Sequence, residues 1–369
     1  MTDPLSILWL MLPGQRSFRE LHWLSMMPGS LVTAIGSPTP PEPVTHLHRG
    51  YIQPTHRYVE AGAIAWLRDV GSIPGRFDFV ASLEMCSLVT GQATTLARKR
   101  GMLQSVIVWA NDPRSPLYWS PPHRRSLRRS RNADLFLCMI EAAREHCVAL
   151  GVPDERCEVV LPGVDLELFH PPRAPVEEPV CLFVSPLAAN KGIDTVLDAF
   201  ALVRAQQPDA RLWVAGQGPL EALVRTRAAD SGGAIRYLGP LGRERVAQAM
   251  RQAAVFVTAP RPTRVWSEQF GIAYVEAMAS GLPIVTTVCG SNHEAVRPPN
   301  VRTADDARQI ADALGLFLGD AALRRQVGET NRRVAAESHD LRRQVELMSA
   351  AFHRARKRAR NEGGASTGA

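Results

Sequence analysis

The segment from Val255 to Thr287, VFVTAPRPTRVWSEQFGIAYVEAMASGLPIVTT, decides the fold class. It begins with an apolar run (255–260), continues through a polar loop and a helical stretch rich in small residues, and ends with a second apolar run (283–287). A strand, a helix and a second strand in this order predict a βαβ unit, and repeated units predict a parallel sheet. The same alternation recurs along both halves of the chain, so the fold class is α/β.

Two sheets are expected, separated by the proline-rich stretch PPRAPVEEP (171–179), which is typical of a stiff linker. The expected strands are 6–12, 30–36, 77–83, 105–111, 133–139 and 157–163, then 180–187, 210–216, 235–239, 255–260 and 283–287. The expected domains are an N-terminal α/β domain (1–170), the linker (171–179), a C-terminal α/β domain (180–338), a helix (339–358) packing back on the N-terminal domain, and a disordered tail (359–369). Such sheets face each other across a cleft, where ligands usually bind.

The composition limits the class of protein. A chain of 369 residues exceeds one ordinary core, and 45% hydrophobic and 21% charged residues are ordinary for a globular protein. The net charge of +7 comes almost entirely from arginine, because lysine occurs only at Lys99, Lys191 and Lys357. We read this arginine bias as compositional, and it suits anionic ligands or an anionic membrane surface. No recognition motif accompanies it, so no nucleic-acid partner is expected.

The cysteines and the apolar runs indicate the cellular compartment of the protein and whether it has a metal site. The six cysteines are scattered without a C-x-x-C pair, so neither a zinc site nor a disulfide framework is signalled, and we expect small core residues in a reducing compartment. The first apolar run lacks a basic region before it, and no run approaches the ~18 residues that span a membrane. We therefore expect a cytoplasmic protein without a zinc site.

Two carboxylates stand out within the opening segment. Glu268 and Glu276 are eight positions apart, so on one continuous helix they would lie about 80° apart. They converge if Glu268 lies in the loop before the helix, whose N-terminus favours an anion such as phosphate. A nucleotide diphospho-sugar satisfies such a set, because the carboxylates accept hydrogen bonds from sugar hydroxyls. The alternative is a solvated helix with two surface glutamates.

The segment WSEQFGIAYVEAMASGLPIV (266–285) resembles the E-x7-E region of glycosyltransferase family 4, which contains retaining enzymes of the GT-B fold. Further segments resemble this family in the family's order: LPGVDLELFHPP (161–172), SPLAANKGIDTVLDAF (185–200), WVAGQGPL (213–220) and IRYLGPL (235–241). The resemblance is specific over 134–296. It implies a GT-B fold with a Rossmann-like acceptor domain (1–170) and a Rossmann-like nucleotide-sugar-binding domain (180–338). It also implies a nucleotide-sugar donor, no divalent metal and no cofactor.

The resemblance also implies roles for single residues. Glu276 would bind the donor ribose, Glu268 would orient the donor sugar, and Lys191 would stabilise the diphosphate. The other donor-site residues implied by the matching segments are Gln269, Phe270, Gly271, Gly192, Gly216, Gly218 and Leu238. The alternative for Lys191 is that it is an exposed lysine of a loop without a role in binding. Where the family usually has a diphosphate-binding arginine this chain has Pro186, and Arg261 and Arg264 are candidates to replace it.

The N-terminal half offers weaker candidates. Gly14 follows the first expected strand, Glu84 ends a later one, and Asn111 and Asp112 follow another. Side chains at strand carboxyl ends line binding sites in α/β folds, although Glu84 and Asp112 could equally cap helices. Five arginines lie on an expected short helix and suit a peripheral contact with the inner membrane face, or else a solvated surface. They are Arg124, Arg125, Arg128, Arg129 and Arg131.

The sequence therefore predicts a retaining, metal-independent hexosyltransferase. It would move a sugar from a nucleotide-sugar to a hydroxyl of a glycan, a lipid-linked saccharide or a small molecule, with Glu268, Lys191, Asn111 and Asp112 at the reacting centre. Two alternatives stay open. One is another GT-B activity, an epimerase or a phosphorylase. The other is a weakened GT-B domain that serves as a binding or scaffold protein, as Pro186 and the sparse glycines after the first strand would suit.

Overall fold

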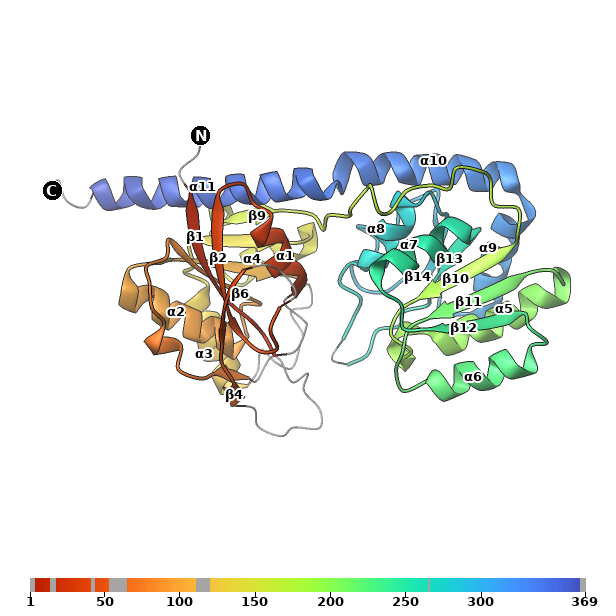
Figure 1. Cartoon of the computed structure of the whole chain (residues 1–369), viewed down its shortest axis with the longest axis horizontal. Coiled ribbons are helices and arrows are strands. Elements are labelled where there is room, and N and C mark those ends of the chain that lie inside the picture. The colour runs from red at the N-terminus through yellow and green to blue at the C-terminus, as the bar shows by residue number, and fades with distance from the viewer. Residues whose placement is uncertain are drawn as a thin grey trace. The chain divides into compact units, whose positions relative to one another are not determined.

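The computed structural model describes residues 4–13, 18–40, 44–52, 65–110, 120–264 and 266–365. The chain divides into two compact units. Unit 1 comprises Met1–Leu161 and Arg342–Ala369, and unit 2 comprises Pro162–Leu341. Each contains its own parallel sheet with helices packed against it, as an α/β fold requires (Figure 1).

The sheet of unit 1 has the strand order β3-β2-β1-β6-β7-β8-β9, with every neighbouring pair parallel. Its strands are β1 (Leu5–Leu10), β2 (Ser30–Gly36), β3 (Thr45–His48), β6 (Phe79–Leu83), β7 (Leu103–Val108), β8 (Leu135–Cys138) and β9 (Cys157–Val159). Its helices are α1 (Phe18–Ser25), α2 (Leu88–Arg100), α3 (Pro121–Ser130) and α4 (Glu141–Ala149), with short 3-10 turns η2 (Val70–Ser72) and η4 (Asp154–Arg156). A separate antiparallel pair joins β4 (Tyr51–Ile52) and β5 (Trp66–Leu67).

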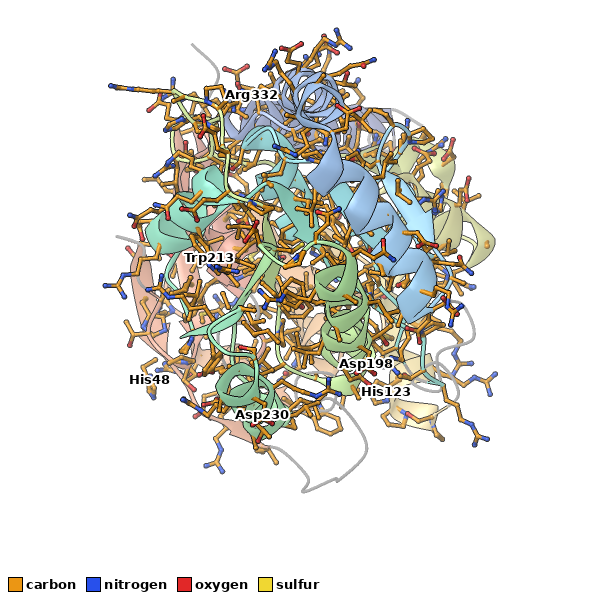
Figure 2. The ribbon with its side chains drawn as sticks, turned by 90° about the vertical axis from the view of Figure 1, so that its right-hand side faces the viewer. His48, His123, Asp198, Trp213, Asp230 and Arg332 are labelled. Carbon is orange, nitrogen blue, oxygen red and sulfur yellow. The ribbon has the colours of Figure 1, made fainter. Side chains whose placement is uncertain are left out.

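The sheet of unit 2 has the order β12-β11-β10-β13-β14-β15 and is also parallel. Its strands are β10 (Val180–Val184), β11 (Arg211–Ala215), β12 (Ile235–Gly239), β13 (Val255–Val257), β14 (Ile284–Thr287) and β15 (Val301–Thr303). Its helices are η5 (Ala189–Lys191), α5 (Ile193–Gln206), α6 (Glu221–Asp230), α7 (Arg243–Gln252), α8 (Ile272–Ala279), α9 (Ala307–Gly319) and α10 (Ala321–Ser338). Asp198 of α5 pairs with Arg227 of α6 at 2.7 Å, which joins these two helices (Figure 2).

The start of unit 2 is held by α10. The guanidinium of Arg332 donates hydrogen bonds to the carbonyl oxygens of Phe169 (2.8 Å), Ala279 (2.9 Å) and Leu166 (3.3 Å), and Figure 2 labels it on this helix. Val164 forms a bridge with Asp340. These bonds tie the chain to unit 2 before the proline-rich stretch, so residues 171–179 lie within unit 2.

The last helix, α11 (Leu341–Ala365), packs from Arg342 onward with unit 1. One stripe of its residues is buried: Leu341, Val345, Met348, Phe352 and Ala355. The ring of Phe352 meets that of Phe79 with centroids 4.8 Å apart, and Arg354 pairs with Glu158. The helix reaches Ala365 rather than ending at Arg358, because no proline interrupts it and Arg358 is itself anchored, to the carbonyl of Asp134 at 2.7 Å.

Candidate functional site

The candidate site of unit 2 lies where its sheet changes direction. From β10 the chain adds β11 and β12 on one side, then returns to place β13 on the other side of β10. Loops that leave the carboxyl ends of two such strands diverge, and in open α/β sheets the space between them holds the ligand. The loop after β10 carries Lys191, and the loop after β13 carries Glu268.

Lys191 and Glu268 are brought together by these two loops. The ammonium Nζ lies 2.7 Å from Glu268 Oε2, with the two side chains 20% and 13% exposed. The same ammonium lies 4.3 Å from the centre of the Trp266 ring, a cation–π contact. This ion pair is mostly shielded from water, so its electrostatic interactions are stronger than those of a surface pair. The structure therefore brings together the two residues that the sequence analysis assigned to the donor sugar and the diphosphate.

The turn that carries Lys191 depends on Gly192. This glycine has φ of 68° and forms the start of α5, and a Cβ there would lie 1.8 Å from the carbonyl oxygen of Ala259. Only glycine fits a left-handed position this close to another backbone. The loop after β10 thereby packs directly against the loop after β13.

Glu268 is positioned by a loop that the sequence analysis missed. Its backbone N–H donates to Cys289 Sγ at 3.4 Å, and its carbonyl accepts from the N–H of Ser291 at 2.9 Å. Gly290 lies between them with φ of 54°, and a Cβ there would lie 2.1 Å from the Glu268 carbonyl oxygen. The only sequence signal was a glycine shortly after the strand that ends at Thr287.

The other residues of the opening segment lie at the start of α8. Gly271 occupies the N-cap position, so Gln269 and Phe270 immediately precede the helix. The Phe270 ring is buried, with its centroid 5.7 Å from that of His339, so the ring itself is not accessible to a ligand. Glu276 lies on α8 and is partly buried, and its carbonyl oxygen accepts from Ser280 Oγ at 2.9 Å.

The candidate replacements for the missing arginine differ in their surroundings. Arg261 is bonded to Asp194 and lies 3.6 Å from Asp305, so two carboxylates already balance its charge. Arg264 is exposed. Pro186 is exposed as well, and its carbonyl accepts from the N–H of Ala188 at 2.9 Å.

The remaining residues expected at the donor site lie at the carboxyl ends of β11 and β12. The N–H of Gly216 donates to the Gly239 carbonyl at 2.9 Å, which places Leu238 beside this turn. Gly218 approaches the backbone of Leu187 in the loop after β10. The structure thus joins these residues to the loop that carries Lys191.

In unit 1, Glu84 lies at the carboxyl end of β6, also beside the strand where its sheet changes direction. Its Oε1 accepts from the backbone N–H of Trp109 at 3.1 Å, while Oε2 is buried with no hydrogen-bond partner among the described residues. Burial raises the pKa of Glu84 to about 7. Such a group can exchange a proton near neutral pH.

A second buried carboxylate beside Glu84 was not expected. Glu20 of α1 is 2% exposed, and its Oε1 accepts from the indole N–H of Trp109 at 2.9 Å. Burial raises the pKa of Glu20, and its charge contributes to raising that of Glu84. The sequence carried no signal for it, since an acidic residue in a first helical turn is ordinarily solvated. The expected partners Gly14, Asn111 and Asp112 lie outside the described residues.

The expected arginine-rich helix is α3. Its buried face is formed by His123, Ser126 and Ser130, and Ser126 Oγ donates to the carbonyl of Ser87 at 2.6 Å. Its exposed arginines are Arg124, Arg125 and Arg128, followed by Arg131, while Arg129 is partly buried. A groove beside α3 has a volume of about 530 Å³ and is lined by apolar groups, including Trp66, Val70 and Leu88, and by Lys99, Arg125 and Arg129. Within the described residues, no helix is both long and apolar enough to cross a membrane.

Comparisons with known proteins agree on one family. Residues 165–334 match the model described as Glycosyl transferases group 1. A D-inositol 3-phosphate glycosyltransferase of Jonesia denitrificans is 33% identical over 223 residues, which cover 53% of this chain and 51% of that protein. A GDP-mannose-dependent alpha-(1-6)-phosphatidylinositol monomannoside mannosyltransferase of Mycolicibacterium smegmatis is 29% identical over 279 residues, covering 69% and 72%. A GDP-mannose-dependent monoacylated alpha-(1-6)-phosphatidylinositol monomannoside mannosyltransferase of Corynebacterium glutamicum matches over 42% of this chain and 42% of its own length. The chain thus spans about half the length of several curated relatives that it matches.

Solved structures share the fold. Anabaena HepE in complex with UDP superposes with a TM-score of 0.74 at 16% identity, over 95% of this chain and 99% of that one. A sucrose-phosphate synthase from Thermosynechococcus elongatus superposes with a TM-score of 0.64 at 17% identity, over 95% and 98%. These similarities confirm the expected pair of Rossmann-like parallel sheets.

Proposed function

We propose that the chain, whose residues 165–334 match the Glycosyl transferases group 1 model and whose two sheets have the GT-B fold, transfers a sugar from a nucleotide-sugar to an acceptor hydroxyl with retention of configuration. The observation that carries this proposal is the shielded ion pair between Lys191 and Glu268. It lies where the unit 2 sheet changes direction, between β10 and β13, and Glu268 lies in the loop that leads into α8. A cation, a carboxylate and a helix N-terminus at one point suit a diphosphate attached to a sugar.

In the proposed reaction, the acceptor oxygen forms a bond to the anomeric carbon while the bond from that carbon to the diphosphate oxygen breaks. The electron pair stays on the departing oxygen, and the acceptor proton is transferred to it. The Lys191 ammonium and the N-terminus of α8 stabilise the developing charge, and Glu268 orients the sugar hydroxyls. Glu276 binds the ribose. In this scheme the cation at the diphosphate is a lysine.

The class of acceptor that we propose is taken from the names of the relatives. Their names specify phosphatidylinositol mannosides and inositol 3-phosphate as acceptors. We propose an inositol-containing acceptor, with GDP-mannose as the first donor to test. A peripheral contact of α3 with an anionic membrane fits a lipid acceptor, since its arginines are exposed beside an apolar groove.

The test is product analysis with nucleotide-sugars that are labelled in the sugar. The full chain is incubated with UDP- and GDP-sugars and with inositol phosphate or phosphatidylinositol vesicles. Label transferred to the acceptor, with the anomeric configuration kept, supports the proposal. Label in an epimerised sugar or a sugar 1-phosphate supports an epimerase or a phosphorylase instead. Binding of the donor without any turnover supports a scaffold protein.

A further inference from the structure

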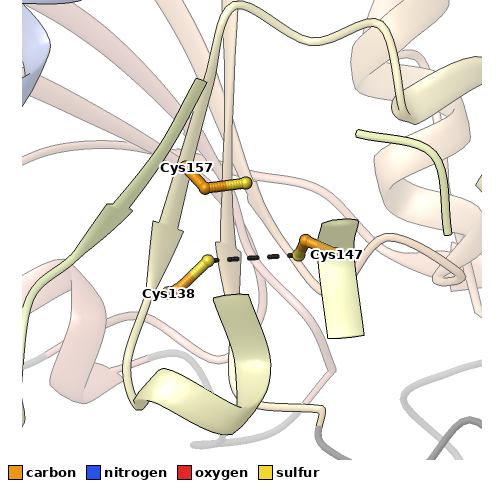
Figure 3. Close-up of side chains that lie close together, drawn as sticks. All are labelled: Cys138, Cys147 and Cys157. Atoms are coloured by element: carbon orange, nitrogen blue, oxygen red, sulfur yellow. Dashed lines mark hydrogen bonds between the residues drawn. The ribbon is translucent and has the colours of Figure 1, made fainter. Parts of the chain in front are cut away.

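Three cysteine side chains converge in unit 1, outside the site described above. Cys138 ends β8, Cys147 lies on α4 and Cys157 begins β9, and Figure 3 shows their sulfur atoms pointing toward one another. The three Sγ atoms all lie within 4.8 Å of one another, and those of Cys138 and Cys147 are 4.0 Å apart. The sequence did not reveal this cluster, because each cysteine comes from a different element.

A fourth sulfur adjoins the cluster. The Met85 thioether lies 3.7 Å from Cys147 Sγ and is buried. Cys138 and Cys147 are fully buried, whereas Cys157 is 9% exposed. Among the described residues, the cluster contains no histidine or carboxylate. Its donors are therefore all soft.

We propose that Cys138, Cys147 and Cys157 bind one Cu(I) ion, with the Met85 thioether as a weak additional ligand. Three sulfurs about 2.3 Å from a central metal in a trigonal plane lie about 4.0 Å apart, which is close to the Cys138–Cys147 separation. Thiolate and thioether ligands select Cu(I) and zinc, but structural zinc sites use four cysteine, histidine or carboxylate ligands, whereas this cluster provides three cysteines. The Cys157 Sγ, which lies within 4.8 Å of the other two, reaches the same separation by side-chain rotation.

Binding of Cu(I) to this cluster is a ligand-exchange step without electron transfer. When Cu(I) binds, metal–sulfur bonds form, the displaced thiol protons go to solvent, and the metal keeps its oxidation state. A disulfide between Cys138 and Cys147 would instead require an oxidant and a closing of the 4.0 Å separation.

The test is competition for Cu(I) by the reduced, full-length protein against a chromophoric Cu(I) chelator. We expect one equivalent to leave the chelator for the protein, and X-ray absorption to show about three sulfur neighbours at about 2.3 Å. Cys138→Ser and Cys157→Ser should each weaken binding by about 100-fold or more, beyond the 10–100-fold typical of residues outside the ligand shell. The control is Cys181→Ala, which removes a fully buried cysteine of unit 2.

Circular dichroism and nucleotide binding by unit 2 show whether each variant has folded. Should Cys138→Ser fail to fold, the variant at Cys157, which is 9% exposed, is decisive. The proposal is overturned if the wild-type protein withdraws no copper, if Cys157→Ser retains full affinity, or if Cys181→Ala loses it. Tighter binding of Zn²⁺ than of Cu(I) in the same competition overturns the choice of metal.

Discussion

Glu268 is the residue whose chemical role is most sharply testable. Glu268→Gln keeps the size of the side chain and an oxygen that can accept from Lys191, but it removes the charge. We expect turnover to fall by about 100-fold or more, as when a transition-state contact is removed, while nucleotide affinity changes by only a few-fold. Steady-state kinetics and a nucleotide titration measure the two effects. The matched control is Glu329→Gln, an exposed glutamate of α10; equal turnover in the two variants would remove Glu268 from the site.

Glu84 makes the stability of unit 1 depend on pH. Because burial raises its pKa to about 7, the folded protein holds a proton that the unfolded chain releases near pH 4.5. Stability from this group is therefore complete below pH 4.5 and declines as the pH rises to about 7. Glu84→Gln should stabilise the protein by about 1–3 kcal/mol at pH 8 and little at acidic pH. Urea unfolding against pH measures this, with the exposed Glu145→Gln as the control; an unchanged pH profile would contradict it.

For single residues, the sequence predicts those that belong to a recognisable motif. It does not predict those whose importance comes from contacts with segments distant in the chain. Lys191 and Glu268 were predicted from a matched pattern, and the structure brings them together. Glu20 and Gly290 were missed, because the burial of one and the backbone contact of the other depend on segments distant in the chain. The roles of Lys191 and Glu268 in catalysis stay predictions.

Among the elements, the turn between η5 and α5 is the most demanding. Gly192→Ala should destabilise unit 2 by about 2 kcal/mol or more, because it combines a left-handed backbone position with a Cβ 1.8 Å from the Ala259 carbonyl oxygen. Gly232→Ala is the matched control, since its φ of 61° is similar but a Cβ there would meet nothing within 4 Å. Denaturant unfolding compares the two. An equal loss in both variants would show that the contact with the loop after β13 has no effect.

Helix α3 carries the proposed membrane contact. Replacing Arg125 and Arg129 together by glutamate reverses the charge along the groove and should weaken binding to anionic vesicles by about 10-fold or more, since each basic residue near the surface contributes about 1 kcal/mol. Co-sedimentation with phosphatidylinositol-containing vesicles measures it. The control, Arg325 and Arg333 of α10 replaced by glutamate, makes the same change of net charge on exposed residues of unit 2. A similar loss of vesicle binding in both double variants would show that net charge alone, rather than α3, determines binding.

Elements with long apolar runs were predictable, and short or polar ones were not. All the expected strands are present, although most are shorter than expected. The strands β3 and β15 were missed, because THLH and VRT have neither the length nor the apolar character of a buried strand. Each forms at a sheet edge, where only one neighbour is required.

At the scale of the whole molecule, the division into two units follows tertiary contacts rather than composition. Unit 2 begins at Pro162, before the proline-rich stretch, because Arg332 and the Val164–Asp340 bridge hold that segment. The buried stripe of α11 returns the end of the chain to unit 1. Proline content predicts stiffness, but it does not indicate to which core a segment is bound.

The central claim is that the loops after β10 and β13 bind the diphosphate of a nucleotide-sugar. Calorimetric titration of UDP and GDP into the wild-type protein and Lys191→Met tests it most directly, because methionine keeps an unbranched apolar side chain next to Trp266 and removes the charge. Loss of one charged contact to phosphate costs about 1.5–3 kcal/mol, so the affinity for the preferred nucleotide should fall by about 10–150-fold. Lys357→Met, at an exposed position of α11, should leave it unchanged. Equal affinity in the wild-type protein and Lys191→Met, or binding of neither nucleotide by the wild type, would contradict the claim.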